Sequence, residues 1–138
     1  IFAVSLVQLL INSGINLSNL PSMPIVIARA LSLGPFFIII SPFIGVLGAF
    51  IAGSNTVSNL LFAPFQNETA LALGLSPIII LALQTLGGAV GNMIAPHNII
   101  AASATVNLNH KEGIIIRANI LPALAYALLA GIIALLFF

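Results

Sequence analysis

Residues 53–59, Gly-Ser-Asn-Thr-Val-Ser-Asn, place hydroxyl and amide side chains in the middle of a strongly apolar stretch. Such groups hold a carboxylate through their N–H and O–H donors, or a hard cation such as Na⁺ through their oxygens. Ser54 or Asn55 is a candidate N-cap for a helix that begins near Thr56. The unpaired backbone N–H groups and the dipole at the start of a helix attract anions. The segment is therefore predicted to bind a carboxylate, a cation or both.

Two pairs in this segment, Asn55 with Asn59 and Ser54 with Ser58, are four residues apart, so each pair would align along one helix. Helix packing is the alternative, because small and hydroxyl-bearing residues are enriched at membrane helix interfaces. We favour binding here, since two asparagines beside a glycine exceed what packing requires. Packing is the favoured interpretation for Gly45, Gly48 and the pair Gly87 and Gly91.

A second polar interruption divides the apolar unit over residues 77–108. Three glycines, Asn92 and the sequence Pro96-His97-Asn98 occur within it, which predicts a discontinuous helix with a non-helical segment within residues 91–97. Gln84, Gly88 and Asn92 are spaced by four and would present two amides and a glycine on one face, where a neighbouring backbone can approach closely. His97 would either cap the next helix or carry a proton.

Composition limits the class of protein. Hydrophobic residues make up 61% of the 138-residue chain and charged residues 4%, against about 25% charged in soluble domains. This indicates an integral membrane protein. A net charge of +1 argues against nucleic-acid binding, and zero cysteines exclude disulfides and thiolate metal sites. His97 and His110 have neither a cysteine nor an intramembrane acid beside them, so we expect no enzyme.

We expect an all-α polytopic helical bundle with about four spanning or half-spanning units, at ~20 residues per span. The predicted elements are a truncated helix (1–17), an interfacial helix (25–33), a re-entrant hairpin (36–66), a broken helix (77–108) and a final packing or lipid-facing helix (114–138). Arg29 would reach toward lipid headgroups, and the polar segment 67–76, which contains Glu68, would connect two units.

The re-entrant interpretation rests on length. A helix over 56–66 would be roughly 16 Å long, about half of a ~30 Å hydrocarbon core. The alternative is that 36–52 crosses completely and 56–66 lies flat on the surface. Many transporters contain two such sets of elements, which indicates that the chain is part of a larger protein.

A resemblance to a known family becomes specific at these residues. PFIGVLGAFIAGSNTVSNLLFAPFQ (42–66), GGAVGNMIAPHNIIAASATVNL (87–108) and KEG (111–113) resemble the C-terminal region of the L-lactate permease family, and order and spacing agree over roughly residues 5–120. That family is similar in architecture to the ion-transporter superfamily of anion transporters, so the resemblance implies one repeat of an inverted-repeat transporter.

In that superfamily a Ser-Asn-Thr hairpin tip meets an unwound helix at the substrate site. Carried onto this chain, the resemblance implicates residues of both segments in substrate binding, and Asn59 joins them because it is four residues after Asn55. The complete set is Ser54, Asn55, Thr56, Asn59, Gly91, Asn92, His97 and Asn98.

The resemblance implies proton-coupled uptake of L-lactate, glycolate or a related 2-hydroxy monocarboxylate across a bacterial cytoplasmic (inner) membrane. The implied partners are the substrate carboxylate, a coupling proton, the lipid bilayer and the N-terminal half of the same transporter; no cofactor or metal is expected. A Na⁺-coupled carboxylate transporter and a non-transporting membrane scaffold are the alternatives. Lys111 and Arg117 predict that the loop over residues 109–117 is cytoplasmic.

Overall fold

The computed structural model describes residues 5, 8–9, 12–23, 25–26, 34–108 and 110–137. Within these ranges it is helical and contains no strand. The helices are η1 (Asn12–Gly14), η2 (Gly34–Phe36), α3 (Phe37–Ala52), α4 (Asn55–Leu73), α5 (Pro77–Gly91), α6 (Pro96–Thr105) and α7 (Glu112–Phe137). The helices expected over 1–17 and 25–33 stay predictions, because only residues 5, 8–9, 12–17 and 25–26 of them are described; Arg29 lies outside the described residues.

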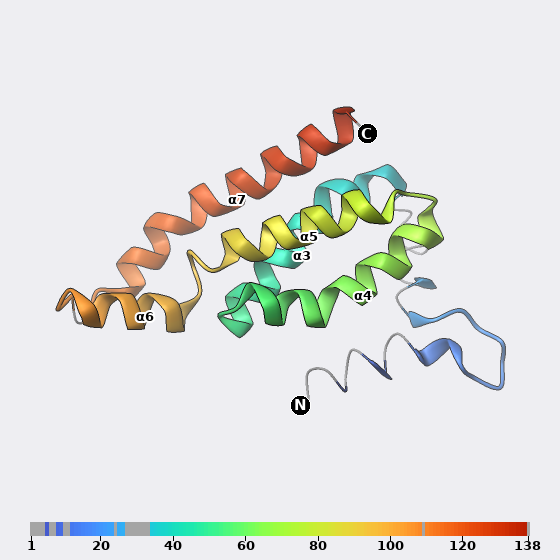
Figure 1. Ribbon diagram of the computed structural model, residues 1–138, viewed down its shortest axis with the longest axis horizontal. Coiled ribbons are helices and arrows are strands. Elements are labelled where there is room, and N and C mark those ends of the chain that lie inside the picture. Colours follow the sequence, from blue (N-terminus) through green and yellow to red (C-terminus); the bar gives the residue numbers. More distant parts are fainter. Residues whose placement is uncertain are drawn as a thin grey trace.

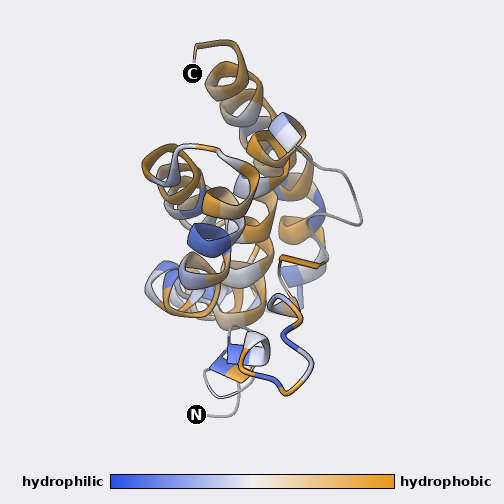
Figure 2. Cartoon of the chain, turned by 90° about the vertical axis from the view of Figure 1, so that its right-hand side faces the viewer, coloured by the Kyte–Doolittle hydropathy of each residue, from blue (hydrophilic) through white to orange (hydrophobic). Residues whose placement is uncertain are grey.

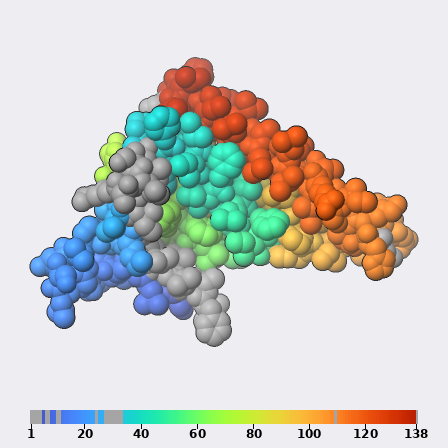
Figure 3. All heavy atoms as spheres, turned by 180° about the vertical axis from the view of Figure 1, so that it is seen from behind, coloured from blue at the N-terminus to red at the C-terminus, as the bar shows by residue number. Residues whose placement is uncertain are grey.

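Helices α3 and α5 form the centre of the molecule, with α4 along one side and α7 along the other (Figure 1). Helix α3 contacts α4, α5 and α7. Seen from behind, α7 covers the flank of α3 (Figure 3). Every element that carries the predicted polar site therefore contacts the α3–α5 pair or directly continues one of its two helices.

Two helical stretches, Gly34–Ala52 and Glu112–Phe137, are long and apolar enough to cross a membrane. Helices α5 and α6 together make a third span if the pair, bent by 41°, is counted as one. The C-terminal helix is hydrophobic along most of its length (Figure 2). The expected class, a helical membrane protein, is confirmed.

Both expected backbone breaks are present. Helix α3 ends at Gly53, whose φ of 66° lies in the left-handed region that glycine adopts without strain, and Ser54 is extended. Helix α5 ends at Gly91, and Pro96 starts α6 after a short non-helical segment. Proline fits there because the first residue of a helix needs no intrahelical N–H bond.

Helix α4 is longer than predicted, so the expectation that it ends near residue 66 is wrong. It runs for 19 residues to Leu73 and contains Pro64, which gives about 28 Å at 1.5 Å per residue. Buried Thr69 and Ala70 hold the second half of α4 in the core, and Gly74, at a φ of 69°, ends it. The half-buried Glu68 thus lies in a helix rather than in a connection. Helix length no longer supports a re-entrant hairpin.

Glycines allow α3 and α5 to touch backbone to backbone. A Cβ added at Gly45 would collide with the Gln84 carbonyl, and one at Gly87 with the Pro42 carbonyl. Helix α7 also packs through small residues, although mostly alanines rather than glycines. Its buried residues are Ala123, Ala127, Gly131 and Ala134. The packing interpretation of Gly45 and Gly87 is therefore confirmed.

Candidate functional site

The tip between α3 and α4 is built by local hydrogen bonds. The Gly53 N–H donates to the Ala49 carbonyl at 2.7 Å, which closes the last turn of α3. The Ser54 side chain accepts from the Val57 N–H at 3.3 Å, so Ser54 is the N-cap of α4, as expected. The N–H groups of Asn55 and Thr56 stand in the first turn of α4, where a helix offers them no intrahelical acceptor.

The start of α6 contacts this tip through Asn98, two residues after Pro96. Its Nδ2 donates to the Gly53 carbonyl at 3.2 Å, and to the Asn92 carbonyl and Asn92 Oδ1, both at 3.4 Å. The Asn98 amide thus connects the two breaks, and it bonds Gly53 across 45 residues of sequence.

His97 lies directly against the tip. A Cβ at Gly53 would collide with the His97 ring atoms Cδ2 and Nε2, so the glycine makes room for the imidazole as well as for the turn. The His97 side chain is otherwise exposed. It is the one titratable side chain among the predicted site residues, all the others being uncharged polar residues or glycine.

Asn55 faces the second glycine of α5. A Cβ at Gly88 would collide with Asn55 Oδ1, and this oxygen is buried without a hydrogen-bond partner in the described protein. Asn92 follows Gly88 by four residues, just beyond the end of α5, and contacts Asn98. Gln84 and Gly88 both face α4, as their spacing predicts, whereas Asn92 contacts α6.

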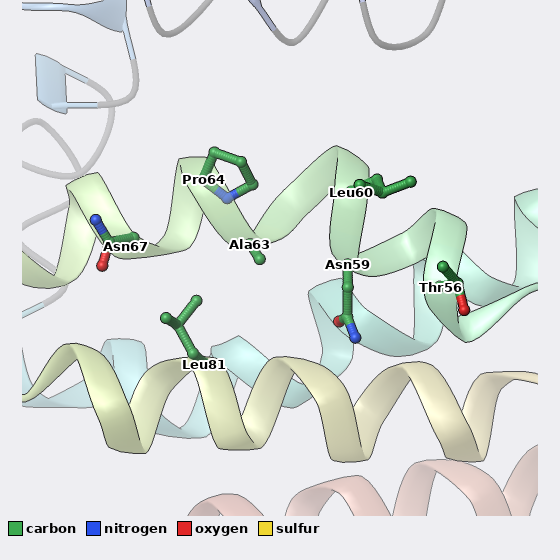
Figure 4. A pocket seen from close by; sticks show the side chains of 7 residues that line it. All are labelled: Thr56, Asn59, Leu60, Ala63, Pro64, Asn67 and Leu81. Carbon is green, nitrogen blue, oxygen red and sulfur yellow. The ribbon is translucent and has the colours of Figure 1, made fainter.

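Thr56 and Asn59, the second and fifth residues of α4, lie beside a groove between α4 and α5 (Figure 4). The groove has a volume of about 510 Å³ and is lined by Thr56, Asn59, Leu60, Ala63, Pro64, Asn67 and Leu81. Figure 4 shows the Asn59 side chain extending from α4 toward α5. Asn59 Oδ1 accepts from Gln84 Nε2 at 3.3 Å.

Gly91 is placed differently from the other predicted site residues. A Cβ there would collide with the Val46 carbonyl of α3, so its packing face points to α3 rather than to the tip. The structure thus brings Ser54, Asn55, Asn92, His97 and Asn98 to the two breaks. Thr56 and Asn59 lie at the groove.

Sequence reasoning missed a fully buried hydrogen-bond network that joins α3, α4 and α5. Ser41 Oγ donates to Gln66 Oε1 at 2.5 Å and contacts the Ile80 carbonyl at 3.0 Å. Gln66 Nε2 donates to Gln84 Oε1, and Gln84 Nε2 donates to Ser58 Oγ at 3.1 Å. The spacing of Gln84 with Gly88 was the one available signal; Ser41 and Gln66 gave none.

The buried amides and hydroxyls of this network bond to one another, and the long helices expose apolar side chains. A protein that crosses the bilayer interior needs both features, because lipid offers no hydrogen-bond partners. The chain is an integral membrane protein.

Comparison with known proteins gives the particular family. The family model for L-lactate permease matches residues 1–138. The chain is 45% identical over 102 residues to a putative L-lactate permease of Haemophilus influenzae, covering 74% of this chain and 19% of that protein. It is 38% identical over 121 residues to the L-lactate permease of Escherichia coli K12, covering 87% and 22%, and 37% identical over 115 residues to the glycolate permease GlcA of that strain, covering 83% and 20%.

This chain therefore belongs to the L-lactate permease family. It spans about a fifth of the length of the curated relatives it matches. No solved structure matches it.

Proposed function

We propose that this chain is the C-terminal part of a secondary transporter that takes up L-lactate, glycolate or a related 2-hydroxy monocarboxylate with a proton across the bacterial cytoplasmic membrane. It has no enzymatic role in this proposal. The N-terminal half of the same transporter completes the substrate site. Two relatives bear the names of lactate and glycolate permeases, which supports this substrate class.

The observation that carries the proposal is the meeting of two backbone breaks. Asn98 bonds the tip carbonyl of Gly53 and the unwound residue Asn92. Broken helices are tolerated at membrane depth where they are buried in protein or line a water-filled cavity, and transporters use their ends to bind substrates and ions. A scaffold has no need of such a feature.

The tip offers donors for an anion. Helix α4 presents the N–H groups of its first turn, and Thr56 and Asn59 add a neutral hydroxyl and a neutral amide. No cationic side chain belongs to this set, so the bound carboxylate would be held by hydrogen bonds and the helix dipole. Weak, neutral recognition suits a substrate that must be released on the other side.

His97 is the proposed proton carrier of this half. Its ring is exposed beside Gly53 at the junction, where a change of charge would act on the tip and the substrate together. His97→Gln keeps a neutral polar side chain and removes the proton site. We expect this variant to retain lactate counterflow and to lose accumulation driven by a pH gradient.

The deciding experiment is L-[¹⁴C]lactate uptake by the full-length protein in proteoliposomes. A pH gradient in Na⁺-free buffer should drive accumulation, and a Na⁺ gradient without a pH gradient should not. Accumulation driven only by a Na⁺ gradient would show that Na⁺, and not the proton, is the coupling ion. The absence of both uptake and counterflow in folded protein would contradict the transporter proposal and favour a scaffold.

A further inference from the structure

The buried network ends at a residue of the candidate site. Gln66 and Gln84 are both fully buried, and their side-chain amides bond to each other. Gln84 Nε2 continues the series to Ser58 Oγ at 3.1 Å and to Asn59 Oδ1 at 3.3 Å. Ser41, Gln66, Gln84 and Asn59 therefore form one chain of hydrogen bonds from α3 to the groove.

Two backbone carbonyls fix the direction of the two glutamine amides in this chain. Gln66 Nε2 donates to the Ser41 carbonyl at 3.1 Å, and Gln84 Nε2 donates to the Ser58 carbonyl at 3.3 Å. A carbonyl oxygen only accepts, so each glutamine must turn its NH₂ group toward it and its oxygen away. Rotating either amide by 180° would place two acceptors against each other in a buried site.

The fixed glutamines determine which end of Asn59 faces the groove. Because the NH₂ group of Gln84 points at Asn59, the Asn59 oxygen must accept from it. Asn59 Nδ2 then has no hydrogen-bond partner among the described residues. It belongs to a side chain that lines the groove with Thr56 and Asn67. Asn59 thereby offers the groove a donor rather than an acceptor.

We propose that Gln84 is a positioning residue that locks the Asn59 amide with its NH₂ group toward the α4–α5 groove, so that this groove accepts the substrate carboxylate and not a cation. The inference rests on the proposed function, and it adds the group that determines whether the groove binds a negatively or a positively charged ligand. Neutral donors without a lysine or arginine fit a single carboxylate.

Asn59→Asp tests the donor directly. Aspartate keeps an oxygen that accepts from Gln84 and replaces Nδ2 by a second acceptor, with almost no change of shape. In lactate counterflow by the full-length protein, we expect the KM for L-lactate to rise at least tenfold at near-normal membrane abundance. Asn119→Asp is the matched control, because among the described residues that amide bonds only the Ile115 carbonyl of its own helix, and its KM should stay within twofold of wild type.

Gln84→Glu tests the positioning role. Glutamate presents no N–H to Asn59, which frees the Asn59 amide to rotate, so the KM should again rise about tenfold. If Gln84 acts through Asn59, then Gln84→Glu should not raise the KM further in an Asn59→Ala background. A role in folding alone would lower abundance and Vmax, and would add to the Asn59→Ala effect.

The outcomes separate the two proposals. Two results would overturn the inference while the wild type stays active and the proposed function stands. The first is a KM in Asn59→Asp within twofold of the wild-type value. The second is additive effects of Gln84→Glu and Asn59→Ala. If Gln84→Glu does not fold, the Asn59→Asp measurement decides alone. A folded wild type that shows no lactate counterflow overturns the proposed function, and this inference with it.

Discussion

Helix α5 has two faces, one that packs against the backbone of α3 and one that contacts polar side chains of α4. Toward α3 it presents Gly87 and Gly91, and the backbones of the two helices touch there, against the carbonyls of Pro42 and Val46. Toward α4 it presents the Gln84 side chain and the side of Gly88 where a Cβ would stand, and the contacts are with side-chain amides and hydroxyls. The glycine face is closed by atoms that cannot move, whereas the amide face is closed by side chains that can.

The two faces of α5 therefore carry different tasks, helix packing on one and proposed ligand contact on the other. Lipid provides no hydrophobic force that holds helices together, so close backbone packing must do so, and only small residues permit it. Amides on the other face satisfy one another and also leave selected atoms for a ligand. Mutations on the two faces should therefore have different readouts even when they are one residue apart.

Gly87→Ala should have the largest effect, because its methyl group collides with the Pro42 carbonyl and neither backbone can yield. We expect a loss of about 3 kcal/mol of stability, at the upper end for an overpacked core. Thermal unfolding and membrane abundance of the full-length protein are the measurements.

The control is Gly88→Ala, whose methyl group meets the end of the flexible Asn55 side chain. We expect its stability to stay within about 1 kcal/mol of wild type, with weaker lactate uptake because Asn55 is displaced. Equal destabilisation by the two substitutions would contradict the distinction between the faces.

Asn55→Ala should reduce lactate affinity with little change in stability. Asn55 Oδ1 has no partner in the described protein, so the truncation leaves no protein group unsatisfied, whereas a ligand group that relies on Asn55 would lose its partner. Such a loss of about 1–3 kcal/mol corresponds to about 5- to 150-fold in affinity. Uptake kinetics and thermal unfolding measure the two effects, with Asn119→Ala on α7 as the control. Wild-type lactate uptake in Asn55→Ala would remove Asn55 from the site.

Ser41→Ala should cost stability and spare substrate affinity. The change leaves Gln66 Oε1 without the Ser41 hydroxyl, a loss of about 1–3 kcal/mol at a buried site. The Ser41 carbonyl remains and still fixes the Gln66 amide, so the KM for lactate should be unchanged. A raised KM together with unchanged thermal stability would show that the hydroxyl itself orients the network.

Gly113→Cys should have the smallest effect, because no atom lies within 4 Å of a Cβ at this position. We expect normal uptake, and labelling by a membrane-impermeant thiol reagent only from the cytoplasmic side, if the loop over residues 109–117 is cytoplasmic as predicted. Labelling from outside intact cells would reverse the orientation.

The two backbone breaks could be predicted because their causes are local. Gly53 and Pro96 act on the backbone at their own positions, and Ser54 caps the helix that follows it through the N–H of Val57. The end of α4 could not be predicted in this way. Pro64 and the polar residues after it favour a break, but the burial of Thr69 and Ala70 continues the helix to Leu73.

Hydrophobicity, motif order and glycine or proline chemistry need no distant partner, so the membrane class, the family and the positions of the helix breaks could be read from the residues alone. The contact of Asn98 with the tip and the pairing of Gln66 with Gln84 across 18 residues became visible only in the packed helices. The direction in which Asn59 presents its amide belongs to this second group. A hydrogen bond between helices depends on which faces pack together, and the type of a residue does not specify its distant partner.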